Sequence, residues 1–184
     1  MKHQIKKILT ESAEETENAG YEFAQNLKGG DIVCLTGDLG SGKTTFVKGI
    51  AKGLGIKSRI ISPTFVLIRQ YKIIPKLEER HSEFILRQAQ NGEQSRTISE
   101  SVKMLNQVQH DKIKKLYHID LYRLDKESDI KALGLEELFN YKNSVIVIEW
   151  AEKLGNLLPK KRWELKFKYL DEEQREIRIE KMNA

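Results

Sequence analysis

The spacing of apolar residues changes its period several times in the first third of the chain. Residues 12–15, SAEE, have the form of a helix capping box, and apolar residues at helical spacing follow up to Leu27. This pattern predicts a helix that Gly29 and Gly30 stop. Residues 31–36, DIVCLT, form a short apolar run typical of a buried strand. Residues 44–54 return to helical spacing, and the glycine that follows is expected to end this second helix.

The rest of the chain is patterned mainly as strands. ISPTFVLIRQYK, at 61–72, is rich in β-branched and aromatic residues and predicts a strand. LYHIDLYRL, at 116–124, alternates with period two and predicts a strand with one apolar and one polar face. After a short helical region interrupted by glycine at 128–139, SVIVIEW at 144–150 predicts a buried strand. RWELKFKYL and REIRIEKM, which close the chain, predict an antiparallel pair.

One segment, from about Lys72 to Lys115, differs from the rest in composition. It is rich in Gln, Ser and charged residues, is poor in aromatics, and contributes three of the five formal positive charges of the chain. We interpret it as an inserted surface excursion, partly disordered, with at most a short helix on its one weak apolar stripe. A basic arm for RNA or for a partner protein is the alternative.

Composition narrows the class of protein. A chain of 184 residues, 39% hydrophobic and 32% charged, fits one domain with a real core. Its single cysteine, Cys34, lies in the apolar run at 31–36, so we expect a small buried side chain and no intramolecular disulfide. No stretch approaches the roughly 20 apolar residues of a membrane span, and the N-terminus lacks the apolar core of a signal peptide. We therefore expect a cytoplasmic protein. The net charge of +5 leaves nucleic-acid binding open, with a solvated basic surface preferred.

The chemistry begins at GDLGSGKTT, residues 37–45, which matches G-x-x-x-x-G-K-[ST] and stands between the first expected strand and the second helix. In such a loop, glycines let the backbone approach an anion, and the N–H groups and the helix dipole face it. We expect Lys43 to bind the β- and γ-phosphates, Thr44 to bind Mg²⁺, and Thr45 to contact a further phosphate. The loop residues expected to bind nucleotide are Gly37, Asp38, Leu39, Gly40, Ser41, Gly42, Lys43, Thr44 and Thr45.

Two acids are expected to complete this site, which makes Lys43, Asp120 and Glu149 the predicted catalytic residues. Glu149 ends the buried strand at the sheet edge where the loop lies, so we predict that it binds Mg²⁺ together with Thr44. Asp120 lies on the polar face of its strand and can orient a water molecule or bind Mg²⁺ through water. A structural carboxylate, paired with Arg123 or Lys43, is the alternative.

Two further residues have open roles. Thr64 follows Ser62-Pro63, and its hydroxyl in a stiff turn suits a sensor of the γ-phosphate, although a turn that starts a strand explains it too. His118 is explained equally well by a structural and by a catalytic role.

The class of nucleotide enzyme follows partly from absent motifs. The guanine-reading sequence N/T-K-x-D is not present, which favours ATP over GTP. A small-molecule kinase would need an acceptor pocket and usually an arginine-bearing lid, and the excursion that holds Arg87 and Arg96 is poor in composition for a lid. Such a kinase and a nucleotide-gated adaptor that does not hydrolyse ATP remain the alternatives.

Four motifs in order, GDLGSGKTTFVKGIAKGLG, SPTF, HIDLYRL and the strand ending in IEW, resemble the TsaE (YjeE) family, the ATPases of bacterial tRNA threonylcarbamoyladenosine biosynthesis. The N-terminal SAEETENAGYEFAQNLKGGD also resembles the opening helix of that family. The resemblance covers about residues 4–71 and 116–160. It implies one α/β domain, a P-loop NTPase-like three-layer sandwich with a mostly parallel central sheet.

The resemblance also implies a function. It implies weak Mg²⁺-dependent ATPase activity and association with TsaB and TsaD, which modify position 37 of tRNA, so that tRNA is met only through that complex. Carried over by motif, Lys43 binds phosphate, Thr44 and Glu149 bind Mg²⁺, and Asp120 lies at the γ-phosphate. Thr64 becomes a switch-like threonine, and Trp150 lies beside the nucleotide. The excursion after Tyr71 is longer than the usual connection in the family, which bears on the switch region and on the partner interface.

Overall fold

The computed structural model describes residues 5–73 and 113–183. Its elements, in chain order, are β1 (Lys6–Thr10), α1 (Ala13–Ala24), β2 (Ile32–Thr36), α2 (Lys43–Gly53), β3 (Ile68–Lys72), β4 (Lys115–Asp120), α5 (Glu127–Ala132), α6 (Leu135–Phe139), β5 (Ser144–Glu149), the 3₁₀ segment η1 (Ala151–Leu157), β6 (Arg162–Tyr169) and β7 (Arg175–Met182). Most of the excursion expected at 72–115, with its short helix, lies outside the described residues. Its two ends, Lys72 and Lys115, are partners in the pairing of β3 with β4.

Within the described residues, seven strands form one sheet in the order β1-β7-β6-β2-β5-β4-β3. The pairs β6–β2, β2–β5 and β5–β4 are parallel and make up the centre of the sheet. The pairs β1–β7, β7–β6 and β3–β4 are antiparallel and flank this centre. The expected α/β fold with a mostly parallel sheet and an antiparallel C-terminal pair is therefore confirmed.

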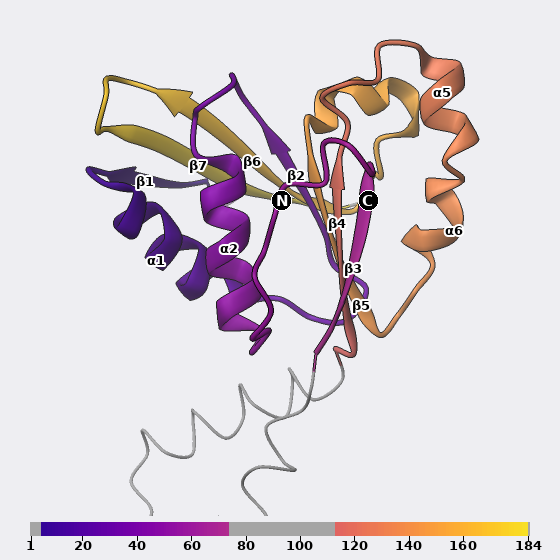
Figure 1. Ribbon diagram of the computed structural model, residues 1–184, viewed down its shortest axis with the longest axis horizontal. Helices are drawn as coiled ribbons and strands as arrows, with labels where there is room; N and C mark the ends of the chain where they lie inside the picture. Colours follow the sequence, from indigo (N-terminus) through magenta and orange to yellow (C-terminus); the bar gives the residue numbers. More distant parts are fainter. Residues whose placement is uncertain (1–4, 74–112, 184) are drawn as a thin grey trace, which may run out of the picture.

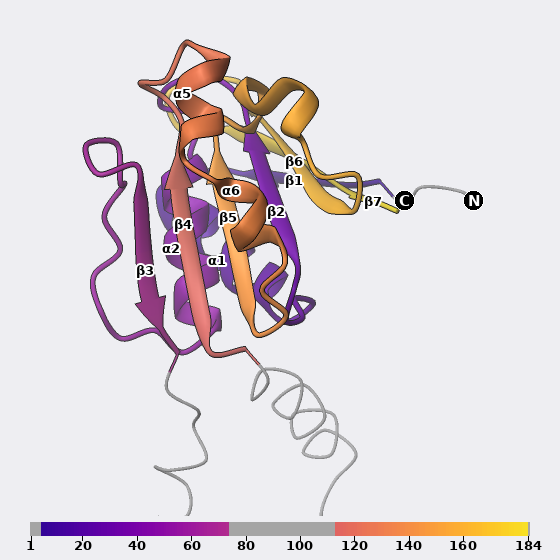
Figure 2. The same ribbon diagram turned by 90° about the vertical axis from the view of Figure 1, so that its right-hand side faces the viewer.

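The sheet is covered on both faces, as expected for a three-layer sandwich. Helices α1 and α2 pack on one face, and α5, α6 and η1 lie on the other (Figures 1 and 2). The buried strand β5 shows both cores, since Val145 and Val147 face α1 and α2 whereas Ile146 and Ile148 face the other layer. No helix in the part of the chain that the structure describes is long and apolar enough to cross a membrane.

Helix α1 begins as its sequence predicts but ends early. The hydroxyl of Ser12 accepts a hydrogen bond from the N–H of Glu15 at 3.0 Å, and the Glu15 carboxylate accepts one from the N–H of Glu11 at 2.8 Å. The helix ends at Ala24, not at Gly29, because the N–H groups of the next residues bond to carbonyls three positions back. The chain tightens into 3₁₀-type turns before the glycines are reached.

Helices α1 and α2 contact each other at unusually short range because glycines lie between them. A Cβ on Gly49 would lie 1.9 Å from the carbonyl oxygen of Glu17, and one on Gly20 would lie 2.2 Å from that of Phe46. Only residues without side chains fit at such a contact. This packing fixes the position of α2, whose first turn follows the glycine loop.

Three strands also differ from the sequence prediction. The strand expected at 116–124 is β4, which ends at Asp120. The strand expected at 61–72 is limited to β3 at 68–72, since Pro63 starts a turn in which its carbonyl accepts hydrogen bonds from the N–H groups of Val66 and Leu67. Leu67 has φ of +61°, which takes the chain out of the extended conformation. Strand β1 was not predicted. It is a mostly exposed edge strand that lacks an apolar pattern of its own and is defined by its pairing with β7.

Candidate nucleotide site

The phosphate loop connects β2 with α2, as the sequence predicts. Gly37 has φ of +128°, and a Cβ there would lie 2.2 Å from the carbonyl oxygen of Phe167 on β6, so glycine is required for both angle and space. Gly42 precedes α2 with φ of +98°. No side chain among the described residues caps α2, so the N–H groups of its first turn stay available to an anion.

The side chain of Lys43 extends from the start of α2 back to this loop, where its amine contacts backbone carbonyls. Its side chain is buried, and Nζ donates hydrogen bonds to the carbonyl oxygens of Gly37 at 2.6 Å and Asp38 at 2.7 Å. The same amine lies 4.1 Å from the centre of the Trp150 ring. Burial lowers the pKa of Lys43 below its ordinary 10.5, against the opposite effect of Glu149 and other nearby carboxylates. A phosphate oxygen would give this ammonium a stronger acceptor than the two carbonyls.

Thr44, Glu149 and His118 form a hydrogen-bonded chain in which Glu149 and His118 are buried and Thr44 is partly buried. Thr44 begins α2, Glu149 ends β5, and the Thr44 hydroxyl lies 3.0 and 2.9 Å from the two carboxylate oxygens of Glu149. His118, on β4, contacts the Oε1 of Glu149 through Nε2 at 2.7 Å. The parallel pairing of β4 with β5 sets this contact, since it brings His118 and Glu149 onto neighbouring strands.

Asp120 anchors the turn at 61–67. Its Oδ2 accepts hydrogen bonds from the hydroxyls of Ser62 and Thr64, both at 2.6 Å, and its Oδ1 accepts one from the N–H of Tyr122 at 3.0 Å. The pairing expected under the structural alternative is not seen, because within residues 5–73 and 113–183 Asp120 forms no ion pair with Arg123 or Lys43, and its partners are the turn residues instead. Arg123 lies over the ring of Phe65 at 4.1 Å instead.

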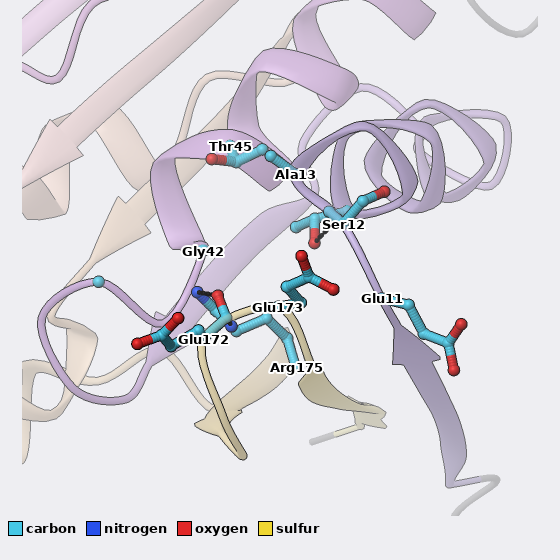
Figure 3. Close-up of a pocket in the computed structure, with 10 residues that line it drawn as sticks. Glu11, Ser12, Ala13, Gly42, Thr45, Glu172, Glu173 and Arg175 are labelled. Atoms are coloured by element: carbon cyan, nitrogen blue, oxygen red, sulfur yellow. Dashed lines mark hydrogen bonds between the residues drawn. The ribbon is translucent and has the colours of Figure 1, made fainter.

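A cavity of about 290 Å³ lies next to the phosphate loop, at Gly40 and Gly42. It lies between the loop, the start of α1 and the turn that joins β6 to β7 (Figure 3). Figure 3 shows the side chain of Arg175 near Gly42 and that of Glu173 pointing toward the start of α1, whereas Glu11 points away. Its lining residues are Glu11, Ser12, Ala13, Thr16, Gly40, Gly42, Thr45, Glu172, Glu173 and Arg175.

The structure brings most of the residues predicted from sequence to one edge of the sheet. Thr44 contacts Glu149, and Lys43 lies close enough for Glu149 and Asp120 to affect its pKa. Thr64 contacts Asp120. Leu39, at the tip of the loop, is 72% exposed and contributes no buried side chain to the site. Cys34 is a free, buried cysteine, and burial raises the pKa of its thiol to about 12.

Sequence reasoning missed two parts of this site. The hydroxyl of Ser62 has the same partner as Thr64, and the SPT triplet was its only signal. The walls of the cavity come from α1 and from the turn at 171–174, which no motif connects with the loop. Both depend on contacts between distant parts of the chain.

The donor set fits a small hard cation that is bound together with a nucleotide. Within the described residues, no group of three or more His, Cys, Asp or Glu could hold a metal ion. Mg²⁺ commonly uses one or two protein carboxylates and takes its other ligands from phosphates and water. A hydroxyl and a carboxylate at 2.9 Å, beside an anion-binding loop, match that pattern.

A strand, a glycine loop and a helix, with the helix hydroxyl on a carboxylate at the end of the neighbouring parallel strand, define a P-loop NTPase-like protein. The crystal structure of Bacillus subtilis YdiB has a similar fold, with a TM-score of 0.66 and 28% identity over 100% of this chain and 89% of that chain. The family model "Threonylcarbamoyl adenosine biosynthesis protein TsaE" matches residues 10–84 and 80–177. The chain therefore belongs to the TsaE family, which serves threonylcarbamoyladenosine biosynthesis in tRNA.

Individual relatives agree with this assignment. The chain is 33% identical over 171 residues to the tRNA threonylcarbamoyladenosine biosynthesis protein TsaE of Bacillus subtilis (strain 168), covering 93% of this chain and 82% of that protein. It is 36% identical over 173 residues to the TsaE protein of Rickettsia prowazekii (strain Madrid E), covering 94% and 92%. The match extends over nearly the whole chain, well beyond the phosphate loop.

Proposed function

We propose that this protein binds ATP with Mg²⁺, hydrolyses the ATP slowly by itself, and thereby supports the tRNA-modifying TsaB–TsaD complex. The main support is the contact of the Thr44 hydroxyl with both carboxylate oxygens of Glu149, at 3.0 and 2.9 Å, beside the buried amine of Lys43. The hydroxyl proton points to the carboxylate, so its lone pairs remain for a cation. When bound, Mg²⁺ would neutralise charge on the phosphate oxygens.

In this proposal the phosphate loop binds the phosphates of the nucleotide, and the cavity binds its nucleoside. The N–H groups that start α2 and the ammonium of Lys43 hold the phosphates, and Thr45 lies at the junction with the cavity. The volume of about 290 Å³ suits a nucleoside, and the carboxylates of Glu172 and Glu173 are acceptors for ribose hydroxyls or for a base amino group. Cofactor recognition would thus depend on the β6–β7 turn as well as on the loop.

Hydrolysis requires a water molecule in line with the γ-phosphate, and Asp120 is the acid best placed to orient it. Asp120 ends β4 next to Glu149 in register, and its Oδ2 already collects the hydroxyls of Ser62 and Thr64. In this proposal Thr64 meets the γ-phosphate and Lys43 stabilises the charge that develops there. None of these residues transfers a group covalently.

Slow turnover is expected because, among the described residues, no arginine forms a hydrogen bond or ion pair with Lys43, Thr44, Asp120 or Glu149. Arg123, the nearest candidate in the sequence, is stacked on Phe65. An arginine supplied by a partner can accelerate such reactions by about 10³ to 10⁵. We propose that the TsaB–TsaD complex stimulates hydrolysis, that tRNA is contacted only through that complex, and that all of this takes place in the cytoplasm.

One set of assays tests the proposal. ATP turnover is measured with and without purified TsaB and TsaD, for the wild type and for Glu149→Gln, and threonylcarbamoyladenosine formation in tRNA is followed in parallel. Stimulated turnover that depends on Glu149 is the expected result. Equal rates with and without the partners would contradict the coupling. Phosphate transfer to an added metabolite would indicate a kinase, and ATP binding with no turnover in any mixture would indicate an adaptor.

A further inference from the structure

His118 is the least explained polar residue of the site. It is fully buried on β4, and its Nε2 lies 2.7 Å from the Oε1 of Glu149. Because a carboxylate only accepts hydrogen bonds, Nε2 is the donor. The other ring nitrogen, Nδ1, has no hydrogen-bond partner among the described residues. Glu149 is therefore the one polar contact that this imidazole makes in the described structure.

This arrangement costs folding free energy, which argues against a purely structural role. A buried polar group without a partner is unfavourable, and Nδ1 is such a group. An aliphatic residue would fill the same position on β4, between the buried Leu116 and the site, at lower cost. What an aliphatic residue cannot do is donate a hydrogen bond to Glu149.

The two donors on Glu149 restrain its carboxylate from two directions. Thr44 approaches from the start of α2, whereas His118 approaches from the neighbouring strand. A carboxylate held by Thr44 alone could rotate about its side-chain bonds. With His118 in place, the oxygen that His118 binds is fixed, and the orientation of the second oxygen toward the loop follows from it.

We propose that His118 is a positioning residue that holds Glu149 in the orientation needed for Mg²⁺, without touching the nucleotide itself. The inference rests on the proposed function, in which Glu149 is the metal-binding carboxylate. Partners that orient metal ligands commonly change metal affinity by about 10- to 100-fold when they are removed. His118 should therefore set the Mg²⁺ requirement of nucleotide binding and leave the metal-free affinity unchanged.

Two amide substitutions separate positioning from polarity. In His118→Gln, the amide nitrogen reaches about as far as Nε2 and can donate to Glu149. In His118→Asn, it is one methylene shorter, lies near the position of Nδ1, and falls short of the carboxylate. The pair keeps the same chemical group and changes only its reach. Glu149→Gln serves as the reference for a lost metal ligand.

The experiment measures binding of a non-hydrolysable ATP analogue by isothermal titration at a series of Mg²⁺ concentrations, and with EDTA in place of Mg²⁺. For His118→Asn we expect the half-effective Mg²⁺ concentration to rise by about 10- to 100-fold, with binding in EDTA unchanged. His118→Gln should stay within about threefold of the wild type. Thermal unfolding of each variant controls for loss of fold.

The outcomes are distinguishable. An equal Mg²⁺ dependence in the wild type and both variants would overturn the positioning role while leaving the proposed function intact. Equal weakening of both variants in EDTA and in Mg²⁺ would assign His118 a structural role and would also overturn it. A wild type whose binding ignores Mg²⁺, or matches Glu149→Gln, would refute the metal site itself, and the positioning role with it.

A measurement on the wild type covers the case in which His118→Asn does not fold. In protein with ¹⁵N-labelled histidine, the Nε2–H signal of His118 should be visible in the nucleotide-free state and should shift when Mg²⁺ is added to the nucleotide complex. A signal that does not respond to Mg²⁺ would contradict the proposal.

Discussion

Two loops border the proposed nucleotide site, and they are held in different ways. The phosphate loop at 37–42 is held where it begins, since Gly37 lies directly against the backbone of Phe167 on β6. The turn at 61–67 has a side chain, Phe65, that is 81% exposed, and it is tied to the sheet through the hydroxyls that bind Asp120. The first loop is held by a close backbone contact with the sheet, whereas the second is attached to the sheet by side-chain hydrogen bonds.

This difference suggests that the two loops have different roles in nucleotide binding. A rigid loop presents phosphate ligands that need no rearrangement, which favours tight binding. A turn that is held by a few hydrogen bonds can open at low cost and respond to what occupies the site. Four sets of variants test the comparison, from the largest expected effect to the smallest.

Gly37→Ala tests whether the contact with β6 holds the phosphate loop in place. Its Cβ would lie 2.2 Å from the carbonyl oxygen of Phe167 at a positive φ, so we expect a loss of about 3 to 5 kcal/mol in the free energy of unfolding by urea. Gly40→Ala is the matched control, since φ is also positive there but no atom lies within 4 Å. It should cost only about 1 kcal/mol. Equal losses would show that the contact with β6 is unimportant.

Lys43→Ala separates binding from folding within the same loop. We expect ATP affinity to fall by about 100-fold, since a charge-assisted contact with phosphate is lost. The free energy of unfolding should stay within about 1 kcal/mol, because burial already disfavours the ammonium. Lys48→Ala, an exposed lysine on the same helix, should change neither quantity.

The lowered pKa of Lys43 also predicts a pH dependence of binding. The charged amine binds phosphate, so wild-type affinity should decrease as pH rises through the lowered pKa, starting below the ordinary 10.5. Lys43→Ala should lack this decrease. Titration of ATP binding across alkaline pH measures it, and a parallel decrease in both proteins would assign the effect to another group.

The two loops also differ in how well the sequence alone could predict their part of the site. Gly37, Lys43 and Thr44 lie within eight residues, and the strand before them and the helix after them are marked by periodicity, so this half of the site was predictable. Glu149 was predictable too, since four β-branched residues before it leave little alternative to a buried parallel strand.

The other half of the site, around Asp120 and His118, depends on the register of the strands and on the turn at 61–67. Ser62 and Thr64 reach Asp120 across 58 and 56 residues, and a proline turn interrupts what composition presents as a continuous strand. His118 was placed on the correct face of its strand by alternation, but its contact with Glu149 required the pairing of β4 with β5. Such contacts are tertiary, and a single sequence contains no local signal for them.

Thr64→Val tests how weakly the second loop is held. One of two hydroxyls on Asp120 is lost, so we expect the local opening free energy of the turn to fall by about 1 kcal/mol while global stability hardly changes. Hydrogen exchange of the Val66 and Leu67 amides, which bond to the carbonyl of Pro63, measures this opening. The Phe46 amide in α2, which donates to the carbonyl of Gly42 at the end of the phosphate loop at 2.9 Å, is the internal control. Ser62→Ala/Thr64→Val should open the turn further than either single change.

The smallest effect is expected at the tip of the same turn, where the guanidinium of Arg123 lies 4.1 Å from the centre of the Phe65 ring. A cation–π contact at an exposed site contributes about 0.5 to 1 kcal/mol. A double-mutant cycle of Phe65→Ala and Arg123→Ala, read out by urea unfolding, should therefore give a coupling energy of about 0.5 kcal/mol, with ATP affinity unchanged. A coupling above about 2 kcal/mol would mean that the pair is desolvated and that the turn is anchored as firmly as the phosphate loop. In that case both loops would be held with similar strength, and the low opening cost proposed for the turn at 61–67 would have no physical basis.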